Sequence, residues 1–130
     1  MTPGNIVGMA AVTGLDVIAV TDHNSCRNCP AVLKLAEQYG VLAIPGMELT
    51  TSEEVHAVCL FSELSAALEF DRFVYEKLMK FPNREEIFGK QQIMNEEDIC
   101  IGTESNLLIN STELSFDEVW DIVTGQYGGV

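Results

Sequence analysis

Residues 17–24 read Val-Ile-Ala-Val-Thr-Asp-His-Asn, and they predict a buried strand that ends in polar side chains. The four apolar residues at 17–20 are typical of a parallel strand covered on both faces. In α/β folds, ligands gather at the carboxyl ends of such strands, and Asp22 and His23 occupy that position here. We therefore expect a functional site where this strand ends.

Helices are predicted where apolar residues recur every three or four positions between terminal signals. The predicted helical segments are 3–14, 30–40, 64–81 and a last segment that begins after Ser115. Ser115 and Glu118 have the spacing of a capping box. On the long helix over 64–81, the charged residues are expected to face water; these are Glu69, Asp71, Arg72 and Glu76.

Further strands are predicted where short apolar runs lie between turn residues. These runs are 41–44, 55–61, 91–94 and 99–101, the last two joined as a hairpin through an acidic turn. Pro45 and Gly46 are expected to break the second strand, and residues 48–54 are expected to form a polar turn. Short β-α-β connections favour parallel pairing, so we expect an α/β fold with parallel strands and flanking helices.

The composition limits the classes of partner. The chain has 130 residues with 20 acidic and 7 basic side chains, a formal net charge of −13, and 47% hydrophobic residues. One domain with a real core is expected. Nucleic acid is disfavoured because neutralising its phosphates requires Lys and Arg, whereas a small phosphate ester would need only a metal ion. The sequence contains neither a secretory signal nor an apolar run near the roughly 20 residues of a membrane span, so we expect a cytoplasmic protein without membrane contact.

Asp22, His23, Glu48 and His56 form a candidate site for divalent metal ions. Imidazole nitrogens and carboxylate oxygens suit zinc, manganese or iron, and a carboxylate that bridges two metals supports phosphoryl transfer. Each residue also has an ordinary structural interpretation. His23 could cap a loop, Glu48 could be a solvated acid, and His56 could be a core histidine. Asp22 is more often the orienting partner of a ligand than a ligand itself.

Cys26 and Cys29 form a Cys-x-x-Cys motif, followed by Pro30, at the start of a predicted helix. A thioredoxin-like redox site has this layout, because the helix N-terminus lowers the pKa of a thiol. A structural zinc site would need two more ligands, and Cys59 and Cys100 are isolated. A thiol redox protein is therefore an alternative to the metal site, and plain reduced thiols are a further interpretation of the motif.

Six segments together match the pattern of a known family: 6–10 (Ile-Val-Gly-Met-Ala), 14–25 (Gly-Leu-Asp-Val-Ile-Ala-Val-Thr-Asp-His-Asn-Ser), 44–51 (Ile-Pro-Gly-Met-Glu-Leu-Thr-Thr), 53–56 (Glu-Glu-Val-His), 87–91 and 107–110. They resemble the PHP (polymerase and histidinol phosphatase) domain family, the last two a bacterial branch of it. The resemblance implies a distorted (β/α)7 barrel with up to three divalent metal ions at the carboxyl ends of its strands. It also implies metal-dependent phosphoesterase activity.

The resemblance also assigns roles to single residues. His23 resembles the metal ligand of the second motif, Glu48 the bridging carboxylate and His56 the histidine ligand of the third motif. Asp22 would support them, so Asp22, His23 and Glu48 are the predicted catalytic residues.

Other motifs of the family do not occur in these 130 residues. They are the His-x-His of the first strand and the Asp-x-His near the C-terminus. We therefore expect residues 1–130 to be the central portion of a PHP domain, a partial barrel that binds fewer metals and is impaired or inactive alone. Because a partial barrel exposes apolar strand edges, a non-catalytic module that self-associates as a homodimer is another alternative.

Overall fold

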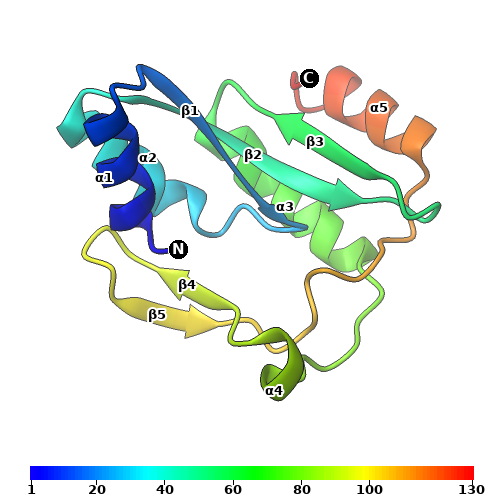
Figure 1. Ribbon diagram of the computed structural model, residues 1–130. Helices are drawn as coiled ribbons and strands as arrows, with labels where there is room; N and C mark the ends of the chain where they lie inside the picture. Colours follow the sequence, from blue (N-terminus) through cyan, green and yellow to red (C-terminus); the bar gives the residue numbers. More distant parts are fainter.

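A computed structural model describes residues 1–130 as two small sheets with five helices (Figure 1). The larger sheet has the strand order β1-β2-β3, formed by β1 (Val17–His23), β2 (Leu42–Thr50) and β3 (His56–Leu60). β4 (Gln92–Met94) and β5 (Cys100–Thr103) pair as a separate antiparallel hairpin, which confirms the hairpin predicted from the sequence. In Figure 1 this hairpin lies below the main sheet.

The predicted barrel is wrong. β1 and β2 are parallel as expected, but β2 and β3 are antiparallel, so the larger sheet is mixed and no barrel closes. The cause is the connection between β2 and β3, which consists only of residues 51–55. A parallel crossover needs about a dozen residues or more, so a connection this short returns the chain antiparallel.

β2 is longer than the sequence predicts. Pro45 and Gly46 do not break it, because they pair with Val20 and Thr21 of β1 in an uninterrupted register. A Cβ atom on Gly46 would lie 2.7 Å from the carbonyl oxygen of Cys59. Glycine is therefore required here for the close approach of β3. Since the strand continues to Thr50, residues 48–50 belong to β2 and not to the predicted turn.

The predicted helices occur with small changes. They are α1 (Pro3–Thr13), α2 (Cys29–Tyr39), α3 (Leu64–Lys77) and α5 (Phe116–Gly125). The short α4 (Glu85–Phe88) was not predicted from the sequence. α3 ends at Lys77 because Leu78 is extended and bridges to Thr112, so the predicted continuation to residue 81 is wrong. The capping box of Ser115 and Glu118 is confirmed. None of these helices has both the length and the apolar character needed to cross a bilayer.

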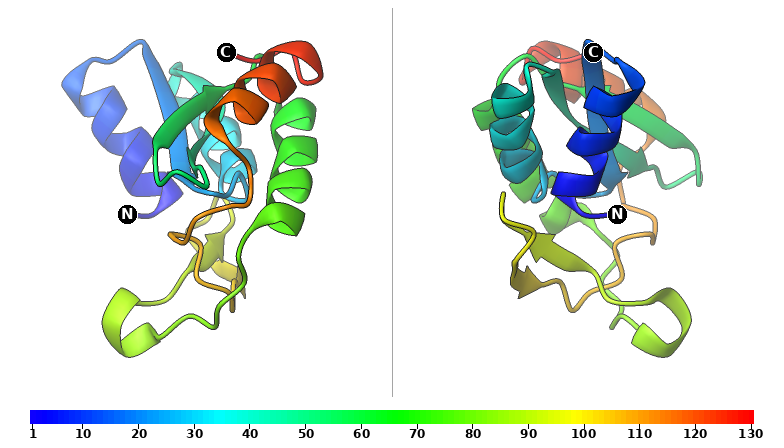
Figure 2. Two further views of the ribbon diagram at one scale, coloured as in Figure 1. Left: turned by 90° about the vertical axis from the view of Figure 1, so that its right-hand side faces the viewer. Right: turned by 60° about the vertical axis from the view of Figure 1, so that its left-hand side comes forward.

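The two faces of the larger sheet differ. One face packs against helices, and its buried residues join those of α2, α3 and α5 in one core; Val20, Met47, Leu49 and Cys59 come from the strands. α2 and α3 lie behind the sheet in Figure 1, and Figure 2 shows α3 from the side. On the opposite face, Val17, Leu42 and Val58 remain 50%, 62% and 58% exposed. His23, Glu48 and His56 have the same strand parity as these residues and share their face.

Candidate metal centre

The sheet register brings His23, Glu48 and His56 together. His23 is the last residue of β1 and pairs directly with Glu48 of β2. His56 pairs with Thr50 and is therefore the diagonal neighbour of Glu48, within reach of a long side chain. The Glu48 carboxylate lies between the two imidazoles, with Oε1 3.0 Å from Nδ1 of His56 and Oε2 3.6 Å from Nδ1 of His23.

The arrangement fits one divalent ion. A ligand atom from each residue lies within 4.8 Å of the other two, and the ring centroids of the histidines are 5.7 Å apart. Nδ1 of His23 is buried and has no hydrogen-bond partner, since 3.6 Å is too long for a hydrogen bond. A metal would satisfy this nitrogen, and two imidazoles with one carboxylate are an established donor set for zinc and iron.

The three side chains are open to solvent on one side. His23, Glu48 and His56 are 39%, 32% and 47% exposed. A site with three protein ligands and solvent access retains coordination positions for water or a substrate oxygen, which distinguishes catalytic from structural metal sites.

Asn24 fixes the end of β1 that carries His23. It is 1% exposed and has a positive φ of 47°, which asparagine tolerates better than most residues. Its amide nitrogen donates to the carbonyls of Leu108 and Asn110 at 2.7 and 2.8 Å, and its Oδ1 accepts from Thr50 N at 2.9 Å. Asn24 therefore connects β1, β2 and the distant segment 108–110. The sequence signal for this role is an asparagine directly after a strand end.

Asp22 lies apart from the three candidate ligands. Successive strand residues alternate between faces, so its side chain leaves the sheet opposite to that of His23. The Asp22 carboxylate is exposed and accepts a 3.2 Å hydrogen bond from Nδ2 of Asn28. The structure thus places the Asp22 side chain against the β1–α2 loop, without the contact to His23 that the predicted supporting role requires.

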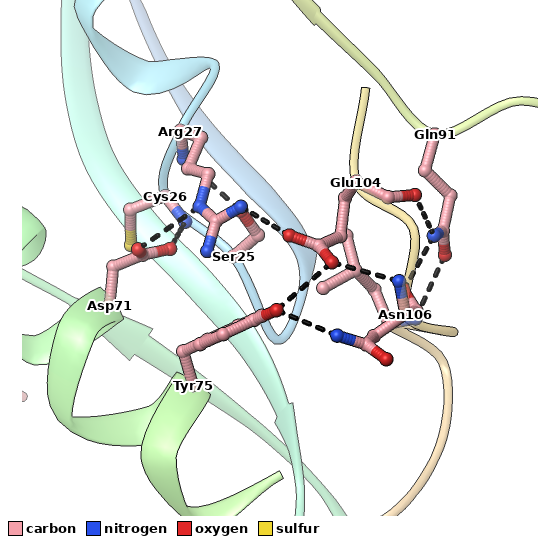
Figure 3. Close-up of polar contacts among 9 residues, drawn as sticks. Ser25, Cys26, Arg27, Asp71, Tyr75, Gln91, Glu104 and Asn106 are labelled. Atoms are coloured by element: carbon pink, nitrogen blue, oxygen red, sulfur yellow. Dashed lines mark hydrogen bonds and ion pairs between the residues drawn. The ribbon is translucent and has the colours of Figure 1, made fainter. Parts of the chain in front are cut away.

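A buried ion cluster lies next to this loop, and the sequence does not predict it (Figure 3). The guanidinium of Arg27 lies between two carboxylates, with its Nε 3.5 Å from Asp71 and its Nη1 hydrogen-bonded to Glu104. Asp71 was expected to face water, but it is 5% exposed and accepts a 2.7 Å hydrogen bond from the backbone N–H of Cys26. Burial makes such pairing obligatory, because an isolated buried charge is costly.

Glu104 anchors the segment after β5 to this cluster. Its Oε1 accepts hydrogen bonds from the Tyr75 hydroxyl at 3.1 Å and the Asn106 backbone N–H at 2.8 Å. Burial alone would raise the pKa of Glu104, but the Asn106 N–H and the Arg27 guanidinium hold that pKa below its usual range. Glu104 is therefore an ionised link between the two parts of the chain.

Cys26 and Cys29 are buried thiols, 0% and 2% exposed, and both donate towards the carbonyl of Gly46. The interaction between the two thiols raises the pKa of Cys26 and lowers that of Cys29, and burial raises the pKa of Cys59 to about 11. The lowered pKa of Cys29 favours redox chemistry, whereas the burial disfavours it because a redox thiol must be reached by its partner. The thiols do not join the group of candidate metal ligands.

The comparisons with known proteins assign no family. No protein-family model matches the chain. An uncharacterized protein of Methanocaldococcus jannaschii is 39% identical over 51 residues, which cover 39% of this chain and 30% of that protein. No solved structure matches.

Proposed function

We propose that His23, Glu48 and His56 bind a divalent metal ion and that the protein acts in the metal-dependent hydrolysis of phosphate esters, as the resemblance to PHP domains implies. The observation that carries the proposal is the convergence of three side chains from three strands within 4.8 Å. The unpartnered, buried Nδ1 of His23 adds to it, because metal coordination would remove its cost.

The charge of the chain also supports a metal. A chain with a formal net charge of −13 repels a phosphate ester unless positive charge is supplied locally. A bound divalent ion supplies that charge and lowers the pKa of its water ligand. The residues of this chain have the positioning role. Glu48 lies between the two imidazoles, and the exposed side of the group remains open to an incoming ester.

Hydrolysis by these residues alone is expected to be slow or undetectable. Only three ligands of the family pattern are present, enough for one ion, whereas the full pattern holds up to three. Metal binding is therefore the primary readout of the proposal, and turnover is the secondary one.

The proposal is tested by metal content and by calorimetric titration of Mn²⁺ and Zn²⁺ into metal-depleted protein. We expect about one equivalent to bind, and we expect the double variant His23→Ala, Glu48→Ala to lose this binding. Glu37→Ala, which removes an exposed acid from α2, is the matched control and should bind as the parent does. Equal uptake by the double variant would overturn the proposal, as would hydrolysis of p-nitrophenyl phosphate that persists in excess chelator.

A further inference from the structure

A cavity of about 350 Å³ lies beside the candidate metal centre. It is bounded on one side by the end of β1 and the β1–α2 loop, including His23 and Asn28, and on the other side by segments 88–93 and 104–109. Its size is at the lower end of small-molecule sites and excludes a folded nucleic acid. Because His23 is in its wall, a molecule in the cavity would lie next to the candidate metal ligands.

The walls of this cavity are held in place by internal hydrogen bonds. The Asn28 amide nitrogen donates to the carbonyl of Gln92, and its oxygen accepts from the N–H of Met94. The Gln91 side chain bonds to the backbone of Glu104 and Leu108 in the same way. The cavity is therefore preorganised, which reduces the entropy cost of binding.

Charge in the cavity differs from that of the whole protein. Arg27 and Lys90 balance Asp22 and Glu104, so the lining side chains have no net formal charge in a chain of −13. Arg27 is committed to its two carboxylates, whereas Lys90 takes part in none of the six ion pairs of the structure. Lys90 is therefore the cation that an anionic ligand can use.

The same cavity has an apolar wall. Phe88 and Ile109 line it and are 51% and 45% exposed, and Leu107 and Leu108 line it as well. An exposed aromatic ring and a free ammonium group that line the same cavity suit a ligand that has an anionic head and an apolar or aromatic body.

We propose that this cavity binds the organic body of a phosphate monoester against Phe88, while Lys90 binds its phosphate. The choice of phosphate as the anion rests on the proposed function, whereas binding in the cavity requires no metal ion. It names the substrate class as a small amphipathic monoester, in preference to a polynucleotide.

The test titrates phenyl phosphate, as the probe, into metal-free protein kept in chelator. Two-dimensional NMR spectra record the backbone amide signals at each step. We expect shifts at residues 88–93, and we expect Lys90→Gln to weaken binding about three- to fivefold, as for a solvent-accessible ion pair. Lys90→Arg should retain binding. Lys80→Gln, which removes another exposed lysine that does not line the cavity, is the matched control.

Two further variants separate the contribution of Phe88 from that of the candidate metal ligands. Phe88→Ala should weaken phenyl phosphate but leave the weaker binding of inorganic phosphate unchanged. The double variant Glu48→Ala, His56→Ala, which changes two candidate metal ligands that do not line the cavity, should still bind phenyl phosphate without metal, so the cavity inference can hold even when metal binding fails. Absence of binding to metal-free protein, or equal affinity of Lys90→Gln and the parent, would overturn the inference even where metal binding succeeds.

Discussion

The Nδ1 atom of His56 lies 3.0 Å from Oε1 of Glu48, across the antiparallel pairing of β2 and β3. The second oxygen of the same carboxylate faces His23 on β1. Glu48 therefore connects all three strands of the sheet on one face. It is also the one carboxylate among the three candidate ligands, so its negative charge contributes most to the attraction of a cation.

Glu48→Gln tests this relationship with almost no change of shape. Because the amide keeps a hydrogen-bonding group but removes the negative charge, we expect the affinity for Mn²⁺ or Zn²⁺ to fall by about tenfold or more. Thermal stability should change little, since the side chain is 32% exposed. Calorimetric titration measures the affinity, and Glu37→Gln on α2 controls for the loss of one charge. An unchanged affinity would show that the carboxylate is not a ligand.

Asn24→Ala is expected to destabilise the fold by about 3 kcal/mol, because it removes three side-chain hydrogen bonds at a buried position. Alanine would also have to adopt the φ of 47° that the loop imposes. Asn24→Gly removes the same bonds without that strain, so it should cost about 1 kcal/mol less. Urea unfolding gives both free energies, and Asn5→Ala at the exposed surface of α1 is the control. Equal free energies for the alanine and glycine variants would show that the left-handed backbone imposes no strain.

Local sequence signals predict most of the elements but not their directions. The glycines that end α1 and α2, Gly14 and Gly40, have φ of 76° and 68°, as their positions in the sequence indicate. Strand direction is not a property of the strand itself. It depends on the connection, and the short segment 51–55 turns β3 antiparallel where a resemblance to a barrel predicts a parallel strand.

The candidate site is predictable only in part, for a related reason. His23 and Glu48 end up together because they fall at matching positions of two neighbouring parallel strands, which the pattern of apolar runs already indicates. The burial of Asp71 cannot be read from its helix, because its partner, the Cys26 N–H, is 45 positions away in sequence. The cavity likewise depends on how segment 88–109 docks on the main sheet, through Asn24, Arg27 and Glu104.

Glu104→Gln should destabilise the protein at neutral pH by about 3 kcal/mol, because it removes a buried carboxylate and leaves the half-buried Arg27 with one carboxylate fewer. The pKa of Glu104 is lowered in the fold from its ordinary 4.5, so its stabilising effect is present above pH 4.5 and is lost as the pH falls through the lower, folded-state pKa. The difference in unfolding free energy between the parent and the Glu104→Gln variant should therefore become smaller below pH 4.5. Unfolding free energies measured between pH 7 and pH 3 check this, and a difference that stays constant with pH would contradict it.

Maleimide labelling tests the redox alternative for the Cys-x-x-Cys pair. Of the four thiols, Cys100 is exposed, whereas Cys26, Cys29 and Cys59 are buried. We expect one thiol to react quickly in the native protein and all four to react in denaturant. Mass spectrometry counts the labels, and Cys100→Ser should leave the native protein almost unreactive. Fast labelling of Cys29 at neutral pH would instead support a redox role.

The exposed apolar residues on the face that carries the candidate metal centre lead to a prediction about self-association. Val17, Leu42 and Val58 are 50%, 62% and 58% exposed and lie on adjacent strands, so a second copy could cover them. The formal net charge of −13 opposes pairing, and salt screens that repulsion. We therefore expect light scattering to detect more dimer as salt and protein concentration rise.

Leu42→Glu should abolish this association, because it places a charge directly beside Val17 on the apolar face. Val12→Glu adds the same charge on α1, at a residue that is 82% exposed, and should leave the dimer intact. If both variants behave alike, net charge controls the association and the apolar face does not. If Leu42→Glu alone is monomeric but still binds metal, pairing through this face and metal binding by His23, Glu48 and His56 are separate properties of the same sheet.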